Sequence, residues 1–286
     1  MSVALKASTR SQEFHFDAAD HQAISSFAYE EAGILLPPGK MQLVYGRLAP
    51  RVRARGLSRF ADYIALIELD AAERTQALDA LTTNHTSFFR EAHHFEHFLE
   101  HAWPALEARL AAGGKVRLWS AACSSGEEPY SLLMAIFGAD RRNGERLART
   151  DLRVLATDLS TEILSAAKAG RYAMDTASGV AQPLRSTWMT RTDNGAEVHP
   201  LVRERVAFRK LNLLEDWPIK GSFDAIFCRN VMIYFDDLTK ERLQARLGAC
   251  LAPGGFLYIG HSERLAASLS PHFACVGRTT FQKVSA

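Results

Sequence analysis

Residues 1–82 carry apolar positions at helical spacing and no convincing strand pattern. In "HQAISSFAYEEAGILL", Ile24 and Phe27 fall on one helical face, because residues three or four apart lie about one turn apart. The next stretch, "PPGKMQLVYGRLAPRVRARG", begins with prolines that suit a first helical turn and ends at Gly56, a residue type common just after a helix. A third helix is predicted to begin at Ser58, which suits an N-cap. The region is therefore predicted to form a small bundle of helices.

From about Lys115 onward, strand-like apolar runs alternate with segments of helix length. The runs are "KVRLWSA", "LRVLATDLS", "VAFRKLNLL", "FDAIFCRN", "GFLYIGHSE" and "FACVGRTTFQKV", and helices are predicted over 127–138, 161–169 and 238–251. Strands separated by helices are typical of a mostly parallel sheet with helices on both faces. The last two runs have no full helix between them, so we expect an antiparallel hairpin at one edge of this α/β sheet.

The segment between Gly170 and Val206 does not fit this alternation. Its "DNG" at 193–195 is a hairpin-turn pattern between two short alternating runs. A structureless loop of about 35 residues would be unusual inside a compact domain. We therefore expect a small antiparallel β-subdomain, inserted at about residues 172–205.

Composition excludes several classes of protein without changing this picture. The 286 residues are 47% hydrophobic and 23% charged, which is ordinary for a soluble globular protein. A net charge of +2 does not indicate a dedicated nucleic-acid binder. The four cysteines are scattered with no CxxC pair, so buried thiols are expected rather than a disulfide framework. We find no signal peptide and no apolar run near the ~18 residues that span a bilayer, and therefore expect a cytoplasmic protein.

The stretch "SAACSSGEEPYS", residues 120–131, lies between a predicted strand and helix, where open α/β sheets bind their ligands. It has a single glycine, Gly126, where a dinucleotide-binding loop has three. Glu127 and Glu128 are stabilised by the helix dipole but would repel a pyrophosphate, which argues against NAD or ATP. S-adenosylmethionine fits better, because it offers an ammonium group, a ribose diol and a sulfonium. The alternative is a pair of capping glutamates on a solvent-exposed turn.

Polar residues also stand at the ends of the next predicted strands. Asp158 can accept hydrogen bonds from ribose hydroxyls, although it could instead cap the following helix, as Ser160 could. Asn212 and Asn230 follow the next two strands, where an amide can recognise an adenine edge or an amino-acid head group. Because parallel strands end at one rim of the sheet, these residues predict one cofactor site.

Two further stretches, "NHTSFFREAHHF" at 84–95 and "FDAIFCRNVMIYF" at 223–235, accompany this loop and "LAPGGFLYIGHSE". Together they closely resemble the CheR-type chemotaxis-receptor methyltransferases, which are S-adenosylmethionine-dependent protein-glutamate O-methyltransferases. The resemblance covers almost the whole chain, with the motifs in family order. It implies a seven-stranded methyltransferase sheet with the inserted β-subdomain, preceded by an all-helical domain. We place the helical, receptor-docking domain at 1–82 and the methyltransferase domain at 83–286, with a linker at 83–105.

The resemblance also implies which residues form the site. The positions that match cofactor contacts of the family are Asn84, Thr86, Arg90, Glu127, Asp158, Asn212, Leu213, Arg229 and Asn230. A carboxylate nucleophile is already ionised near neutral pH and needs no general base, so the catalytic task is positioning. Our candidates for holding the substrate carboxylate are Arg90, with its fork of donors, and Tyr234, with its hydroxyl. The alternatives are a structural salt bridge from Arg90 to Glu91 or Asp158, and a core position for Tyr234.

A basic helix face gives a candidate partner surface. Arg47, Arg51 and Arg55 share a face of the second helix, in a stretch without acidic residues. Such a face suits the glutamate-rich methylation region of a chemotaxis receptor, and the resemblance places receptor contact on this domain; a solvated helix face is the alternative. We expect a monomer whose partners are the cytoplasmic domains of methyl-accepting chemotaxis receptors, without nucleic acid or membrane insertion. In some family members the β-subdomain binds a receptor's C-terminal peptide, which this sequence leaves open.

No metal is expected. His93, His97 and His101 recur every four residues, but no cysteine or HExxH pattern accompanies them.

Three rival functions differ from this prediction. The first is a methyltransferase for another substrate, such as a nucleobase amine. Such enzymes commonly carry a proline-rich loop after the fourth strand, where this sequence has "RNVMIY" and no proline, so this function is disfavoured. A non-catalytic module that binds S-adenosylmethionine or docks on receptors would bind without turnover. An NAD oxidoreductase is disfavoured by the glycine-poor loop.

Overall fold

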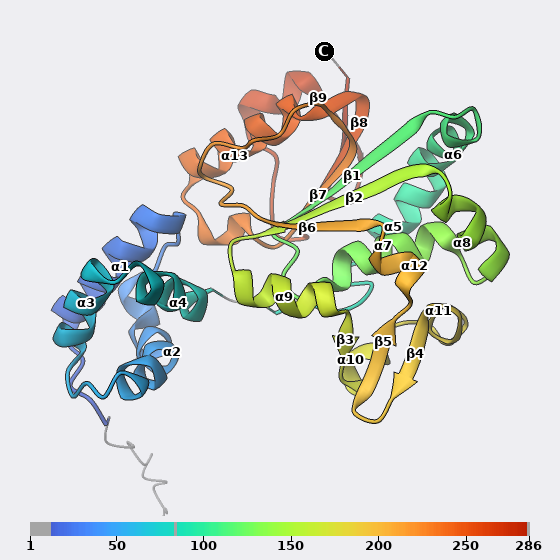
Figure 1. Cartoon of the computed structure of the whole chain (residues 1–286). Helices are drawn as coiled ribbons and strands as arrows, with labels where there is room; N and C mark the ends of the chain where they lie inside the picture. The colour runs from blue at the N-terminus through green and yellow to red at the C-terminus, as the bar shows by residue number, and fades with distance from the viewer. Residues whose placement is uncertain (1–12, 83–84, 285–286) are drawn as a thin grey trace, which may run out of the picture. The chain divides into compact units, whose positions relative to one another are not determined.

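The computed structural model describes residues 13–82 and 85–284 of the chain. The chain divides into two compact units, Met1–Thr83 and Asn84–Ala286. Figure 1 shows the first as a cluster of helices and the second as a twisted sheet flanked by helices. Over the described residues, no helix combines the length and the apolar character needed to cross a bilayer.

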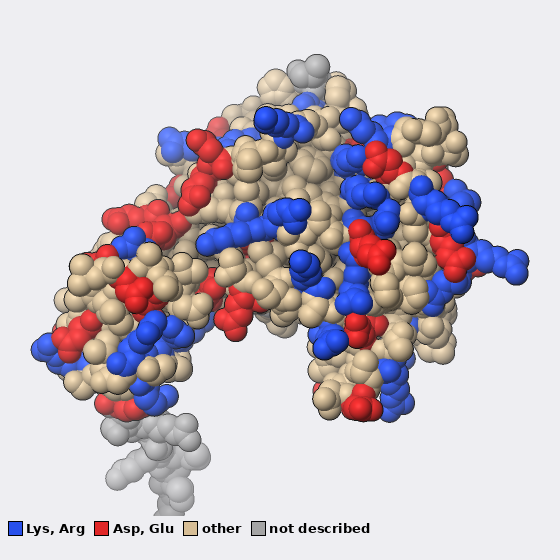
Figure 2. Space-filling model, viewed as in Figure 1, with Lys and Arg blue, Asp and Glu red and all other residues tan. Residues whose placement is uncertain are grey.

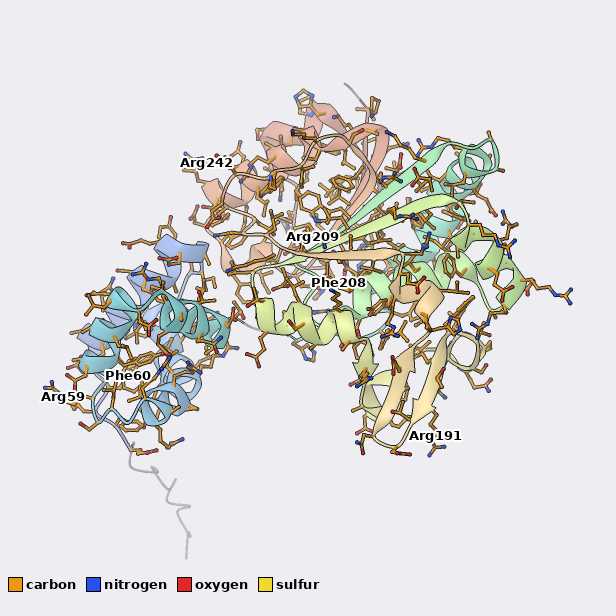
Figure 3. All side chains as sticks on the ribbon, in the orientation of Figure 1. Arg59, Phe60, Arg191, Phe208, Arg209 and Arg242 are labelled. Atoms are coloured by element: carbon orange, nitrogen blue, oxygen red, sulfur yellow. The ribbon has the colours of Figure 1, made fainter. Side chains whose placement is uncertain are left out.

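The N-terminal unit is helical over its described part, as predicted. Its helices are α1 (Ala18–Ala32), the short 3₁₀ helix η1 (Pro38–Lys40), α2 (Met41–Ala54), α3 (Phe60–Leu69) and α4 (Ala71–Leu81). Gly56 follows α2 with a φ of 67°, a conformation that glycine adopts without strain. The prediction that Ser58 caps the third helix is wrong, because α3 begins at Phe60 after Arg59 and has no side-chain cap. In Figure 3, Arg59 points away from the helices while Phe60, which is fully buried, lies among them.

The second unit contains the predicted seven-stranded sheet, in the order β6-β2-β1-β7-β8-β10-β9. Its strands are β1 (Lys115–Ala121), β2 (Asp151–Asp158), β6 (Val206–Lys210), β7 (Phe223–Cys228), β8 (Leu251–Ile259), β9 (Phe273–Gly277) and β10 (Thr280–Lys283). The first five strands in that order pair in parallel, whereas β10 pairs antiparallel with β8 and β9. The edge hairpin therefore forms within the last predicted run, which bends at Thr279, rather than between the last two runs.

Helices cover both faces of this sheet, and the alternation along β1 shows why. Val116 and Leu118 join the core beneath α7 and α8, whereas Trp119 and Ala121 join the core beneath α13. The helices of this unit outside the insert are α5 (His93–His97), the π-helical turn η2 (Phe98–Ala102), α6 (Trp103–Ala111), α7 (Glu127–Phe137), α8 (Arg141–Ala148), α9 (Thr161–Ala169), the 3₁₀ helices η3 (Met232–Tyr234) and η4 (Ala267–His272), and α13 (Asp237–Ala249).

The inserted β-subdomain is confirmed between α9 and β6. Its elements are β3 (Arg171–Tyr172), α10 (Met174–Ala177), α11 (Gln182–Trp188), β4 (Met189–Thr192), β5 (Gly195–Val198) and α12 (Pro200–Arg203), and its sheet order is β3-β5-β4. The short helices were not predicted. Trp188 is fully buried, and its indole N–H donates to the Gly138 carbonyl at 2.5 Å. This side chain ties the insert to the end of α7, so the insert is held against the main sheet domain.

Candidate active site

The five parallel strands end at one rim of the sheet. Ala121, the last residue of β1, pairs with Thr157 of β2 and with Cys228 of β7, and Cys228 pairs with Ile259 of β8. The residues that follow these strands therefore lie near one another. This is the edge at which open α/β sheets bind their ligands.

The loop after β1 is held in a strained conformation. Ala122 and Ser124 have φ angles of 59° and 50°, which residues with a side chain rarely adopt. The Asp158 carboxylate accepts hydrogen bonds from the Ser124 N–H at 2.8 Å and from the Ser160 N–H at 3.1 Å. Gly126 has a φ of 93°, and a Cβ added there would lie 3.0 Å from that of Ala167. Close approach and positive φ explain the one glycine of this loop.

Asp158 is buried at the end of β2, where burial raises the pKa of its carboxyl group against the opposing effect of backbone hydrogen bonds. It does not cap α9, because Ser160 does so through a hydrogen bond from the Ile163 N–H. A carboxylate offers about four acceptor sites, so Asp158 can brace the loop and still accept from ligand hydroxyls.

Glu127 and Glu128 do not form a solvent-exposed capping turn, the alternative raised by the sequence. Glu127 is 4% exposed and accepts a hydrogen bond from the Ser125 hydroxyl at 2.6 Å. The Glu128 side chain is 14% exposed and accepts from the Ser120 hydroxyl at 2.6 Å. Burial raises the pKa of both carboxyl groups. Such groups gain electrostatic stabilisation from a ligand that brings an ammonium group or hydroxyls.

Arg90 lies in a sharp turn of the linker between two residues with positive φ, Phe89 at 54° and Glu91 at 56°. Its guanidinium Nη1 donates to the His85 carbonyl at 2.8 Å, and its own carbonyl accepts from the Arg229 side chain. Within the described ranges Arg90 makes no ion pair, so the predicted alternative of a salt bridge to Glu91 or Asp158 is not observed. Arg90 is half-buried, and the hydrogen bond to His85 is the one that its guanidinium makes among the described residues.

Arg229 and Asn230, which follow β7, are both tied to Glu91. The Arg229 guanidinium is buried, with its Nε 3.7 Å from Glu91 Oε2 and 3.5 Å from Glu128 Oε2. Asn230 Nδ2 donates to Glu91 Oε1 at 3.2 Å, and the Asn230 N–H donates to Glu263 Oε2 at 3.2 Å. These contacts connect the linker to the sheet rim. The proposed role of both residues in cofactor binding stays a prediction.

The sequence reasoning did not assign roles to Glu91, His261 or Glu263. Glu91 Oε1 accepts from the ring Nδ1 of His261 at 2.9 Å and from its backbone N–H at 3.3 Å. Burial alone would raise the pKa of Glu91, but His261, Arg229 and Asn230 outweigh it and lower the pKa to about 2. Glu263 Oε2 accepts from the Gly260 N–H at 2.5 Å. The available signals were that Glu91 directly follows Arg90 in "FFRE", and that His261 and Glu263 lie at the end of the strand-like run "GFLYIGHSE".

The other predicted site residues differ in what they contact. Asn212 closes its own turn, accepting from the Leu214 N–H at 3.0 Å and donating to Glu215 at 3.0 Å. Leu213 is buried in the core beneath α13, against which Tyr234 also packs, half-buried. Thr86 is half-buried, and Asn84 lies outside the described residues. The core contacts of Tyr234 agree with the alternative raised for it.

The histidines of the linker helix make protein contacts. His97 Nδ1 lies 3.1 Å from the Tyr258 hydroxyl, and the fully buried His94 bonds through Nε2 to the Arg278 carbonyl at 3.1 Å. Ligand atoms of Glu91, His93 and His94 lie within 4.8 Å of one another. The guanidinium of Arg229, 3.7 Å from Glu91, disfavours a metal cation at this cluster by charge repulsion.

Two of the three arginines proposed as a partner surface bind a carboxylate inside the helical unit. Arg51 donates to Glu73 through Nε at 2.9 Å and Nη2 at 2.6 Å, and Arg55 donates through Nε at 2.5 Å. Glu73 comes from α4, is fully buried and also accepts from the Tyr63 hydroxyl at 2.8 Å. Arg47 donates to the Leu81 carbonyl. The shared basic face exists, but its members also stabilise the fold.

Comparisons with known proteins agree with this geometry. The sequence profile of the "CheR methyltransferase, SAM binding domain" matches residues 84–282, and that of the "CheR methyltransferase, all-alpha domain" matches residues 19–82. A "Probable chemotaxis protein methyltransferase" of Rhizobium etli is 41% identical over 260 residues, which cover 89% of this chain and 96% of the relative. "Chemotaxis protein methyltransferase 2" of Pseudomonas aeruginosa is 39% identical over 277 residues, covering 94% of this chain and 95% of the relative.

Among solved structures, an S-adenosylmethionine-dependent methyltransferase from Mesorhizobium loti covers 55% of this chain and 51% of its own, with 21% identity and a TM-score of 0.28. That similarity is too low to inform the function. The two profile matches and the relatives of about 40% identity are sufficient to assign the family. The chain is an S-adenosylmethionine-dependent methyltransferase, and it belongs to the CheR methyltransferase family.

Proposed function

We propose that this protein transfers the methyl group of S-adenosylmethionine to glutamate side chains of methyl-accepting chemotaxis receptors, forming glutamate methyl esters. Membership of the CheR family and the names of its relatives support this reading. The carrying observation is the sheet rim, where Glu127 and Asp158 are buried and the half-buried Glu128 faces Arg229, whose side chain donates to the carbonyl of Arg90 in the linker turn. The protein is proposed to act in the cytoplasm as a monomer.

The residues of this rim fit S-adenosylmethionine. Asp158 has acceptor capacity for a ribose diol, and burial raises the pKa of Glu127, so an arriving ammonium group or hydroxyl stabilises the charged form. The loop from Ala122 to Gly126 has small side chains, which allow close approach. A pyrophosphate would meet the carboxylates of Glu127 and Glu128 and be repelled.

The chemistry asked of the protein is mainly positioning. Bound S-adenosylmethionine supplies a methyl group on a positively charged sulfur. The substrate glutamate is ionised near neutral pH and attacks in line, so no general base is needed. Because opposite charges neutralise as the bond forms, a site that excludes water favours the reaction. Holding the carboxylate in line can supply several kcal/mol through effective concentration.

Arg90 is the proposed holder of the substrate carboxylate, with Tyr234 in support. Among the described residues, the Arg90 guanidinium donates one hydrogen bond, from Nη1 to the His85 carbonyl, which leaves other guanidinium donors for a carboxylate. Hydrogen bonds that are too strong would stabilise the charge of the carboxylate and lower its nucleophilicity. We therefore assign orientation, rather than electrostatic activation, to both residues.

The proposed reaction is tested by transfer of a radiolabelled methyl group to receptor membranes, followed by release in mild base, which is diagnostic of an ester. Arg90→Ala is expected to lower turnover at least about tenfold while the fold persists. Base-stable label would point to another acceptor atom. Binding of S-adenosylhomocysteine without any transfer to receptor glutamates would favour the non-catalytic alternative.

Receptor docking on the N-terminal unit is part of this proposal. On the face shown in Figure 2, basic and acidic side chains of this unit lie next to one another, in keeping with its ion pairs. Charge reversal at Arg51 or Arg55 would set a carboxylate against buried Glu73 and damage the fold. Arg55→Gln against Arg55→Lys is the better pair, because Arg51 and Tyr63 still bind Glu73.

If the charge of Arg55 attracts the receptor, Arg55→Gln should raise the KM for receptor methylation and make KM less dependent on salt. Arg55→Lys should keep KM and its salt dependence near those of the wild type. Equal KM values for the two variants at low salt would contradict docking through this charge.

The β-subdomain offers a second receptor contact. β4 lies at an edge of its three-stranded sheet, so one side of its backbone is open to pairing with an added strand. A calorimetric titration with the C-terminal peptide of the cognate receptor tests this contact; absence of heat would contradict it.

A further inference from the structure

The linker turn at Phe89–Arg90–Glu91 is held open against its own conformational preference. Phe89 and Glu91 both occupy the left-handed region, which residues with side chains rarely adopt because of steric strain. The Phe89 N–H donates to the Ser131 hydroxyl at 2.9 Å, which fixes one side of the turn. The other side is fixed through Glu91. A turn of this kind persists only while its surroundings hold it.

Glu91 contacts the ends of two separate strands with one side chain. Its Oε1 accepts from Asn230, which follows β7, and from the backbone and ring of His261, which follows β8. Its Oε2 faces the buried guanidinium of Arg229, whose Nη2 donates to the carbonyl of Arg90. The carboxylate and Arg229 therefore grip the turn from both flanks of Arg90.

The charge of Glu91 is needed for this grip. The Glu91 side chain is 10% exposed and its pKa is lowered to about 2, so the group is ionised near neutral pH. Hydrogen bonds to an ionised acceptor are shorter and stronger than neutral ones. A neutral side chain of the same shape keeps the acceptor for Asn230 and His261 but loses the attraction to Arg229.

We propose that Glu91 is a positioning residue for methyl transfer: its carboxylate ties the strained linker turn to the ends of β7 and β8 and thereby sets where Arg90 meets the substrate carboxylate. This inference rests on the role given to Arg90 under the proposed function. Glu91 does not itself touch the substrate or the methyl donor. Its loss lets the turn relax toward ordinary φ values and moves Arg90 with it.

A double-mutant cycle separates this role from a merely structural one. Glu91→Gln is expected to lower kcat for receptor methylation about tenfold and Glu91→Ala more, with little change in KM or in affinity for S-adenosylhomocysteine. In an Arg90→Ala background, Glu91→Gln should change kcat less than about twofold, because the group that it positions is gone.

Asp224→Asn is the matched control. Asp224 lies at the opposite, amino end of β7, is 12% exposed, and pairs with Arg109 at 2.6 Å, so it has the burial and pairing of Glu91 without contact to the turn. It should lower thermal stability without lowering kcat. Unchanged circular dichroism of Glu91→Gln verifies its fold, and His261→Gln, which removes one donor at a half-exposed position, should show a smaller kcat loss in the same direction.

Two outcomes overturn the inference in different ways. If Arg90→Ala is slow but Glu91→Gln lowers kcat equally in both backgrounds, Glu91 does not act through Arg90, and the proposed function stands. If Arg90→Ala retains normal turnover, the role given to Arg90 is wrong and this inference falls with it.

Discussion

A buried carboxylate must recover from its surroundings the stabilisation that water no longer provides. Burial alone would raise the pKa of Glu73, Glu91, Asp158 and Glu263. Arginine and other side-chain donors outweigh burial at Glu73 and Glu91 and lower their pKa values. Asp158 and Glu263 receive mainly backbone N–H groups, and burial keeps their pKa values raised. The carboxylates of Glu73 and Glu91 thus hold neighbouring segments in place through ion pairs, whereas Asp158 and Glu263 have acceptor capacity close to the sheet rim.

Glu73 should make the N-terminal unit sensitive to acid. Because its pKa is lowered in the folded state, its contribution is present above the unfolded value, about 4.3, and is lost as pH falls through the folded value. Glu73→Gln is expected to cost about 2 kcal/mol near neutral pH. Thermal unfolding followed by circular dichroism should show this difference shrinking as pH falls below about 4. A difference that is constant with pH would contradict the assignment.

His94 should give the second unit an acid sensitivity that begins at higher pH. Burial first, and then the charge of Arg229, lower the pKa of His94 to about 3. Between the unfolded value of about 6.5 and the folded one, the unfolded chain binds the extra proton, so stability falls by up to about 1.4 kcal/mol per pH unit as pH decreases. Unfolding free energies of His94→Gln measured from pH 6.5 to 4.5 should have a shallower slope than wild type. Equal slopes would show that another group is responsible.

At the scale of elements, the junction of β1 and α7 depends on one conformation. Gly126 has a φ of 93°, and a Cβ there would meet Ala167 at 3.0 Å and the Tyr172 hydroxyl at 3.1 Å. Strain and crowding both act on the loop that is proposed to approach the cofactor. The same loop is braced by Asp158 from the end of β2.

Gly126→Ala is expected to weaken S-adenosylhomocysteine binding about tenfold, with a stability loss of about 1–2 kcal/mol. Isothermal titration calorimetry measures the affinity. Gly113→Ala is the control, because Gly113 also has positive φ, at 80°, but nothing lies within 4 Å of its Cβ position, and it precedes the amino end of β1, opposite the rim. Equal affinity in Gly126→Ala and wild type would remove this loop from the cofactor site.

At the scale of the whole molecule, the candidate residues for cofactor binding and for receptor docking fall in different units. Every described candidate for cofactor binding falls within the unit Asn84–Ala286, while the basic face of α2 belongs to the unit Met1–Thr83. The profile matches divide the chain at the same place, with the all-alpha domain at 19–82 and the SAM-binding domain at 84–282. Binding of the methyl donor and docking of the receptor are therefore proposed to be separable.

A chain of residues 83–286 is expected to bind S-adenosylhomocysteine within about threefold of the full chain, as measured by calorimetry. Its KM for receptor methylation should rise at least about tenfold if the N-terminal unit docks on the receptor. An unchanged KM would contradict docking by that unit, while lost cofactor binding would show that the units are interdependent.

Much of the fold could be read from local patterns, because these depend on near neighbours in the chain. Apolar spacing predicted α1, α2 and α3 of the first unit, although not α4, and the alternation of strands and helices in the second. Ser160 caps α9, whereas Ser58 does not cap α3, because a cap also depends on how the chain enters the helix. The hairpin of β9 and β10 was not predicted, since its two central turn residues, Arg278 and Thr279, include no glycine or asparagine.

The partners of charged residues were decided by tertiary structure alone. Arg51 pairs with Glu73, which is 22 residues away in the chain, and Glu91 accepts a hydrogen bond from His261, which is 170 residues away. A search for acids near Arg51 along the chain could not identify a partner that arrives from another helix. For the same reason the contacts of Glu91 could not be predicted, because its partners Asn230 and His261 follow β7 and β8, far from it in the chain.

The sequence by itself determined the class of fold, the inserted β-subdomain and the family, and it predicted the rim at which the cofactor site is proposed. These features follow from residue types and spacings, which either act on near neighbours in the chain or form motifs that resemble those of the family. Only the tertiary structure decided which carboxylates are buried, which arginines neutralise them and how the linker turn is held. Burial and pairing depend on distances in space between segments that are far apart in the chain, and residue spacing along the chain does not contain those distances.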